Sequence, residues 1–220
     1  DAIHNGANVI AEATDETKEE LFQKLKDYTL SNNGKEAMKP QTLHSYSEEV
    51  LRRMYSAMVR TKNLVDISKV SGERMSGNTD LLTYSFPCQD LSNVGAFHHY
   101  NKGIDKDSNS RSSLLWQVGR ILSEMKEAGK HLPRYLIMEN VPTLLAPRHK
   151  GNFDKWKAEL ADLGYVSHEY PLNAKDFGIP QNRPRLLMIS VLVDKTREEE
   201  IREYLNSITP ESIVADYKNS

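Results

Sequence analysis

The chain has 220 residues but only one cysteine, and it lacks any long apolar run. A single thiol cannot close a disulfide within the chain, which favours a reducing, cytoplasmic location. No stretch approaches the roughly 18 consecutive apolar residues that a membrane-spanning helix needs. The first residues also lack the charged, apolar and small-residue series of a secretory signal. We therefore expect a cytoplasmic protein with no membrane partner.

The chain also has little net charge, −2 at pH 7, and it contains no Gly-x-Gly sequence. The charge does not by itself indicate a nucleic-acid partner, so any DNA contact must come from a local basic patch or from other protein. Apolar residues make up 38% of the chain and charged residues 27%, the balance of a folded domain with a polar surface. We expect no metal site.

Two amphipathic helices are predicted before residue 62, joined by a loop at 31–41. The first spans residues 15–30 with Asp15 as its cap, and the second spans 45–60. Their apolar stripes are narrow, which predicts a solvent-exposed excursion. The residues that form these stripes are Leu21, Leu25, Tyr28, Val50, Met54 and Met58.

From residue 63 onwards, short apolar runs alternate with helical patterns. Helices are predicted at 114–128, at 153–163 before Gly164, and at about 196–205. Alternation of this kind predicts an α/β fold with a mostly parallel sheet. The last two runs are separated by one loop, so they can form an antiparallel edge pair. The predicted strands are residues 63–67, 80–86, 134–140, 165–172 and 185–193.

Polar residues follow three of these runs and precede the last one. Ligands of open α/β sheets bind at the carboxyl ends of the strands, so these residues are candidates for one site. Each has a simpler interpretation: a lone cysteine is usually an inert small apolar residue, Glu-Asn can be a solvated turn, and two arginines can be a basic edge. Together they would bring a thiol, a carboxyl group and two guanidinium groups to one rim. The residues concerned are Asp66, Pro87, Cys88, Gln89, Glu139, Asn140, Gln181, Arg183 and Arg185.

Six segments, in order, resemble motifs of the cytosine-5 DNA methyltransferases. FPCQDLS (86–92) resembles the family's nucleophile loop, MENV (138–141) its Glu-Asn-Val motif, and LNAKDFGIPQNRPRLLMI (172–189) its Gln-x-Arg-x-Arg motif. LVDISKV (64–70) and RSSLLW (111–116) resemble cofactor-side motifs, and residues 1–8 resemble the helix after the ribose-binding acid. The resemblance covers roughly residues 63–193. It implies a Rossmann-like fold dependent on S-adenosylmethionine, double-stranded DNA as partner, and a bacterial or phage restriction-modification setting.

The resemblance also assigns roles. Cys88 would attack carbon 6 of a flipped-out cytosine, which makes carbon 5 nucleophilic, and S-adenosylmethionine would donate the methyl group. Glu139, protonated or sharing a proton, would bond to N3, while Arg185 and Arg183 would hold the O2 edge. The polar loop 91–111, with Gly95 and Gly103, resembles the loop that closes on DNA. Further substrate-binding residues would be Pro87, Gln89, Ser92, Asn140, Val141 and Gln181, and cofactor-binding residues would be Asp66, Ile67, Pro87 and Leu114.

The sequence departs from the family pattern at several points. The Phe-x-Gly-x-Gly loop is missing, and Ser113 stands where the family has another small residue, commonly Gly or Thr. Two sheet strands would belong to the missing N-terminal part, which predicts an unpaired strand edge near Leu82 and self-association through it. We expect a helical segment at 1–62, a partial catalytic core at 63–195, and a helix and tail at 196–220 leading towards an absent target-recognition domain.

Three interpretations remain open at this point. The first is a methyltransferase catalytic region, and the second is a truncated or split chain, inactive alone, that serves as a DNA-binding or assembly module. The third is an unrelated thiol hydrolase that uses His98 or His99, although nothing in the sequence orients those residues towards Cys88.

Overall fold

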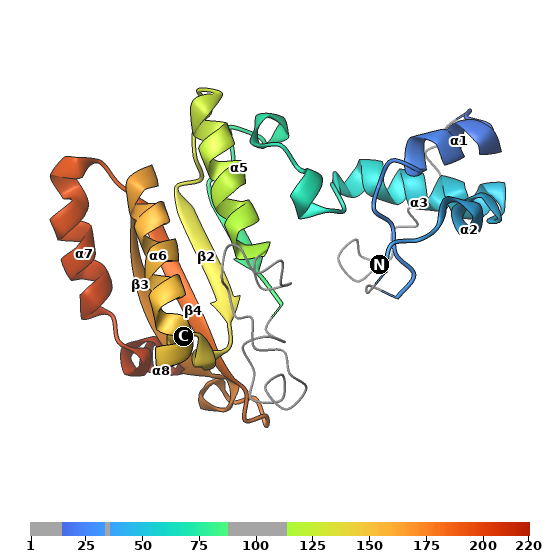
Figure 1. Ribbon diagram of the computed structural model, residues 1–220. Helices are drawn as coiled ribbons and strands as arrows, with labels where there is room; N and C mark the ends of the chain where they lie inside the picture. The colour runs from blue at the N-terminus through green and yellow to red at the C-terminus, as the bar shows by residue number, and fades with distance from the viewer. Residues whose placement is uncertain (1–14, 34–35, 88–113) are drawn as a thin grey trace. The chain divides into compact units, whose positions relative to one another are not determined.

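A computed structural model describes residues 15–33, 36–87 and 114–220 of the chain (Figure 1). The chain divides into two compact units, residues 1–70 and residues 71–220. Among the described residues, no helix is both long and apolar enough to cross a membrane. The predicted three-part division at residues 62 and 195 stays a prediction.

The first unit has a small core of its own between three helices. These are α1 (Lys18–Leu25), α2 (Pro40–His44) and α3 (Glu48–Thr61). Four leucines, Leu21, Leu25, Leu43 and Leu51, are almost completely buried there. The expectation of a merely solvated excursion was therefore wrong, because α2 and partly buried neighbours widen the narrow stripes into a core.

Local hydrogen bonds correct two further details of this unit. The α1 cap is Thr17 and not Asp15, because the Thr17 side chain accepts from Glu20 N–H while the Glu20 carboxylate accepts from Thr17 N–H. This reciprocal capping box satisfies two donors at once. In α3 the fully buried residue is Leu51, whereas Val50 is 38% exposed.

The predicted strand at 63–67 does not form in the structure. Val65 adopts the left-handed region at φ 66°, and a 3-10 helix follows at Ile67–Lys69. The Asn63 side chain accepts from Val65 N–H at 2.8 Å, and the Asp66 side chain accepts from Ser68 N–H at 3.0 Å. These bonds give the backbone a local alternative to a sheet ladder, which explains the error.

The second unit is built on a four-stranded mixed sheet in the order β1-β2-β4-β3. Its strands are β1 (Leu81–Ser85), β2 (Tyr135–Asn140), β3 (Tyr165–Asn173) and β4 (Pro184–Leu192). β1 and β2 are parallel, while β4 is antiparallel to both β2 and β3. The α/β class and the antiparallel pair are confirmed, and β1 lies at the edge with β2 as its strand partner in the described part of the chain.

Helices α5 (Leu115–Glu127) and α6 (Pro147–Leu163) pack on one face of this sheet (Figure 1). The Trp156 indole on α6 donates to the Tyr84 hydroxyl on β1 at 3.2 Å and meets the Trp116 ring edge-on. A methyl group added at Gly119 on α5 would lie 3.0 Å from the Trp156 ring, so glycine allows the two helices to approach closely. α6 begins six residues before its predicted start and ends at Gly164 as predicted.

Helix α7 (Glu198–Ser207) contacts the opposite face of the sheet at β3. Neighbouring side chains of a strand point to opposite faces. Glu169 pairs with Lys157 of α6 at 2.6 Å, while the Tyr170 hydroxyl donates to the Leu205 carbonyl of α7 at 2.8 Å. The two helices therefore cover opposite faces of β3.

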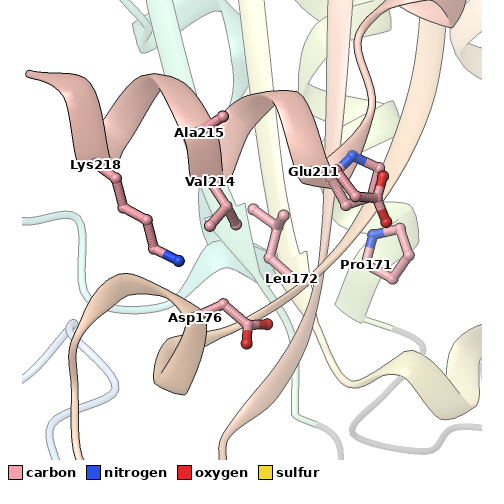
Figure 2. A pocket seen from close by; sticks show the side chains of 8 residues that line it. Pro171, Leu172, Asp176, Glu211, Val214, Ala215 and Lys218 are labelled. Carbon is pink, nitrogen blue, oxygen red and sulfur yellow. The ribbon is translucent and has the colours of Figure 1, made fainter.

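The last helix, α8 (Pro210–Asn219), was not predicted. It packs against a 3-10 turn at Ala174–Phe177, where the rings of Phe177 and Tyr217 meet at 5.2 Å. An open pocket of about 370 Å³ lies between α8 and the end of β3, and Figure 2 shows Val214 of α8 beside Leu172.

Candidate active site

The carboxyl ends of β1 and β2 and the beginning of β4 meet at one end of the sheet, which we call the carboxyl edge to distinguish it from the lateral edge formed by β1. β1 and β2 are parallel, so both end there, and β4 starts there because it is antiparallel to β2. This edge collects the residues that follow the two parallel strands and those that precede the last strand. The end of β2 and the start of β4 thus bring Glu139 and Arg185 together as predicted, whereas Asp66, expected after a strand of this sheet, follows no strand and belongs to the first unit.

Glu139 and Arg185 form an ion pair at this edge. Arg185 Nε lies 2.6 Å from Glu139 Oε1. The Arg185 side chain is 26% exposed and the Glu139 side chain is 41% exposed. Arg185 Nη1 also donates to the Pro184 carbonyl at 2.8 Å, which fixes the orientation of the guanidinium group. Because both side chains stay partly exposed, a ligand can reach the pair, and the site offers both a carboxylate acceptor and guanidinium donors.

Asn140, the next residue after Glu139, is 3% exposed and bonds to backbone groups. Its amide nitrogen donates to the Phe86 carbonyl at 3.0 Å, and its amide oxygen accepts from Val141 N–H at 2.8 Å. Phe86 is itself buried and immediately precedes Pro87. Asn140 thus ties the exit of β1 to the end of β2, and its predicted contact with substrate stays a prediction.

Gln181 and Arg183 lie on the connection between β3 and β4. Asn173, the last residue of β3, holds both ends of this connection through its side chain. Its amide oxygen accepts from Arg183 N–H at 2.9 Å and from Lys175 N–H at 3.3 Å, and its amide nitrogen donates to Asn182 Oδ1 at 2.8 Å. The side chains of Gln181 and Arg183 are exposed.

The predicted cofactor residues fall in different parts of the chain. Asp66 and Ile67 are half-buried in the first unit, and hydrogen bonds from Ser68 and then Thr29 lower the pKa of Asp66. Leu114 precedes α5 in the second unit and is half-buried. The cofactor contacts of Asp66, Ile67 and Leu114 stay predictions.

Several sequence-predicted residues lie outside the described part of the chain: Cys88, Gln89, Ser92, Gly95, His98, His99, Gly103 and Ser113. Their roles stay predictions. Among the described residues, no three histidine, aspartate or glutamate side chains gather in a way that could hold a metal ion.

Comparison with known proteins decides the family. The family model for C-5 cytosine-specific DNA methylases matches residues 19–219. The chain belongs to this family. It is 36% identical to orphan methyltransferase M.SssI of Spiroplasma monobiae, in an alignment that covers 96% of this chain and 55% of the relative. It is 39% identical to type II methyltransferase M2.ScrFI of Lactococcus lactis subsp. cremoris, over 76% of this chain and 49% of the relative.

Among solved structures, the Entamoeba histolytica methyltransferase EhMeth matches with a TM-score of 0.44 and 19% identity, over 62% of this chain and 41% of that chain. The chain spans about half the length of the curated relatives it matches. Membership of the C-5 cytosine-specific DNA methylase family confirms the resemblance found in the sequence motifs.

Two positions that support the site were not singled out from the sequence. The Phe86 carbonyl accepts from the Asn140 side chain, and the Asn173 side chain bonds to the backbone of Lys175 and Arg183 and to the side chain of Asn182. Asparagine directly after an apolar run and before a turn is a recognisable signal for such bonds, because asparagine side chains often bond to nearby backbone.

Proposed function

We propose that these residues form the catalytic region of an enzyme that methylates carbon 5 of cytosine in double-stranded DNA. The methyl donor would be S-adenosylmethionine. One observation carries the proposal: the Glu139–Arg185 ion pair stands at the carboxyl edge, to which β1 leads, and Asn140 fixes the β1 exit two residues before Cys88. Family membership supports the same reaction.

The proposed nucleophile is the Cys88 thiolate. A bond forms between its sulfur and carbon 6 of cytosine, and the electrons of the 5,6 double bond become available at carbon 5. Carbon 5 would then attack the donor methyl group, and the sulfur–carbon bond that breaks in the donor would leave S-adenosylhomocysteine as product. Loss of the carbon-5 proton to water restores the double bond as the bond between the Cys88 sulfur and carbon 6 breaks, so the enzyme is regenerated. Cations close to the sulfur, a role proposed for Arg183 and Arg185, would favour the thiolate over the thiol.

Glu139 and Arg185 would bind the polar edge of the cytosine ring. Glu139 pairs with Arg185 in the structure; with a proton taken from water, it would share that proton with N3 of the ring and so offset charge as carbon 6 is attacked. Arg185 and Arg183 would donate to O2, with Gln181 beside them. Pro87, Gln89, Ser92 and Val141 would line the base pocket. A cytosine within a stacked duplex is out of reach, so the proposal requires base flipping.

The cofactor would supply the electrophilic methyl group at this site. In the first unit, Asp66 would accept from the adenine amino group and Ile67 would contact the adenine ring. In the second unit, Leu114 is a proposed adenine contact and Pro87 would border the reacting end. Asp66 is a half-buried acid whose Oδ1 accepts from Ser68, and its second carboxylate oxygen would be the acceptor for the adenine amino group.

Methyl transfer tests the proposal directly. The gene that encodes these residues, expressed with its flanking reading frame in a methylation-free host, should protect specific cytosines from bisulfite conversion. The matched control is the same gene carrying Cys88→Ser. Complete bisulfite conversion of host DNA with the unaltered gene would count against the proposal.

A second candidate is an incomplete chain that is inactive alone and acts as a binding or assembly module. The position of β1 at the lateral edge of the sheet, within the described residues, favours this candidate. So does the exposure of two paired residues: Leu81 is 48% exposed and its register partner Tyr135 is 39% exposed. An exposed edge of this kind accepts a further strand, from another segment or a second copy. The 220 residues alone should self-associate on a sizing column and bind S-adenosylmethionine weakly in calorimetry. A monomer with micromolar affinity would contradict this candidate.

A further inference from the structure

The side chain of Asn173 joins the two ends of the β3–β4 connection, residues 174–183. The sheet ladder ends at the pair Asn173 and Pro184. Proline has no N–H, so it cannot donate a hydrogen bond across the ladder. The nearest donor, Arg183 N–H, goes instead to the Asn173 side-chain oxygen at 2.9 Å, and Ala174 N–H donates to the Arg183 carbonyl at 3.2 Å.

The Asn173 side-chain amide makes two further hydrogen bonds, one at each end of the connection. Its oxygen also accepts from Lys175 N–H at 3.3 Å, and its nitrogen donates to Asn182 Oδ1 at 2.8 Å. One half-buried side chain therefore fixes residues on both sides of the connection. These three bonds, two from backbone N–H groups and one to the Asn182 side chain, limit where the exposed Arg183 side chain can go.

Arg185 and Arg183 are held in different ways. Arg185 lies within the strand, in register with Leu172, and pairs with Glu139. Arg183 lies beyond the last ladder pair, and its backbone is held by the Asn173 side chain at its N–H and by Ala174 N–H at its carbonyl. We propose that Asn173 is a positioning residue, which holds Arg183 beside the Glu139–Arg185 pair. This inference rests on the proposed function, in which Arg183 contacts the cytosine ring.

The outer part of the connection has support besides Asn173, which caps its 3-10 turn through Lys175 N–H. The 3-10 turn at Ala174–Phe177 packs against α8, with Phe177 against Tyr217, and ends at Gly178 with φ 76°. Figure 2 shows Asp176 of this turn facing α8 across the pocket. Removal of the Asn173 side chain should therefore displace Arg183 without unfolding the turn.

Three variants separate positioning from a general structural role. Asn173→Ala removes all three bonds and should lower kcat about 10-fold to 100-fold, since displacement of a contact group by an ångström has effects of this size. The KM for S-adenosylmethionine should not change. Asn173→Asp should restore kcat to within about threefold, because both backbone N–H groups keep an acceptor and the Asn182 amide can turn to donate. Asn182→Ala, which removes one bond, is the matched mild control.

A double-mutant cycle with Arg183→Ala gives the sharpest readout. If Asn173 acts through Arg183, adding Asn173→Ala to Arg183→Ala should cause no further loss of kcat. Multiplicative losses, or failure of Asn173→Asp to restore kcat, would overturn the inference. If Asn173→Ala does not fold, Asn173→Ser takes its place in the cycle. The assays use the methylation-active protein: if the unaltered protein transfers no methyl group, the proposed function fails, whereas an active protein with an unaffected Asn173→Ala variant refutes only the role of Asn173.

Discussion

Asn140 donates from its side-chain amide to the carbonyl oxygen of Phe86, 54 residues earlier in the chain, at 3.0 Å. The bond joins the ends of two parallel strands, one of which carries Glu139 while the other leads to Pro87. The candidate acid and the segment that brings in the candidate nucleophile are thus held by one buried side chain.

Asn140→Asp should therefore impair catalysis, although the two side chains are almost equal in size. The aspartate can still accept from Val141 N–H but, when ionised, cannot donate to Phe86. An unsatisfied buried group costs about 1–3 kcal/mol, and a buried charge costs more. We expect a lower melting temperature and a kcat reduced about tenfold or more, measured by thermal melting and methyl transfer. Asn78→Asp, which adds the same charge at an exposed asparagine, is the control and should behave like the unaltered protein.

Glu139→Gln should reduce turnover about a hundredfold or more, because a positioned acid–base group contributes on that scale. DNA affinity should remain nearly unchanged, since the contact to the ring matters most as charge develops. Arg185→Ala should lower turnover and also weaken binding of the flipped base. Steady-state kinetics and DNA titration separate the two effects. Near-normal turnover of Glu139→Gln would show that the proposed contact to N3 is wrong.

The buried side chain of His149 should make the stability of the folded protein depend on pH. The side chain on α6 is 5% exposed, and its buried Nε2 has no hydrogen-bond partner among the described residues. Burial, and then the charge of Arg148, lower the pKa of His149 below its usual value. The unfolded chain therefore takes up a proton before the folded one does, so stability is full above about pH 6.5 and falls as the pH decreases.

His149→Gln should flatten this decline. Melting temperatures measured between about pH 7 and pH 5.5 provide the test. His131→Gln, at an exposed histidine, is the matched control and should keep the slope of the unaltered protein. Equal slopes for all three proteins would remove His149 as the cause.

The sheet and its carboxyl edge could be predicted because their signal is local. The runs around Leu82, Leu136 and Leu187 are apolar, bounded by polar residues, and long enough for strands. The run at 63–67 looks similar, but Asn63 and Asp66 bond to their own backbone, and apolar content alone does not reveal this competition.

The support of the site could not be predicted in the same way. Asn173 precedes a turn in the sequence, but its bonds to Asn182 and Arg183 depend on the way the connection folds back. The burial of Asn140 likewise depends on the parallel pairing of β1 and β2. α8 was missed because Ile213, Val214 and Tyr217 form only a short apolar pattern.

The central claim is that Cys88 attacks cytosine, and covalent trapping tests it most directly. Duplex DNA with 5-fluorocytosine at the target position cannot lose its carbon-5 substituent as a proton, so the adduct should persist. With S-adenosylmethionine present, the methylation-active protein should yield a protein–DNA band that survives denaturation, and mass spectrometry should place the link at Cys88, the only cysteine. The Cys88→Ser variant should yield no such band. An adduct that forms equally well with Cys88→Ser, or a link at another residue, would contradict the account.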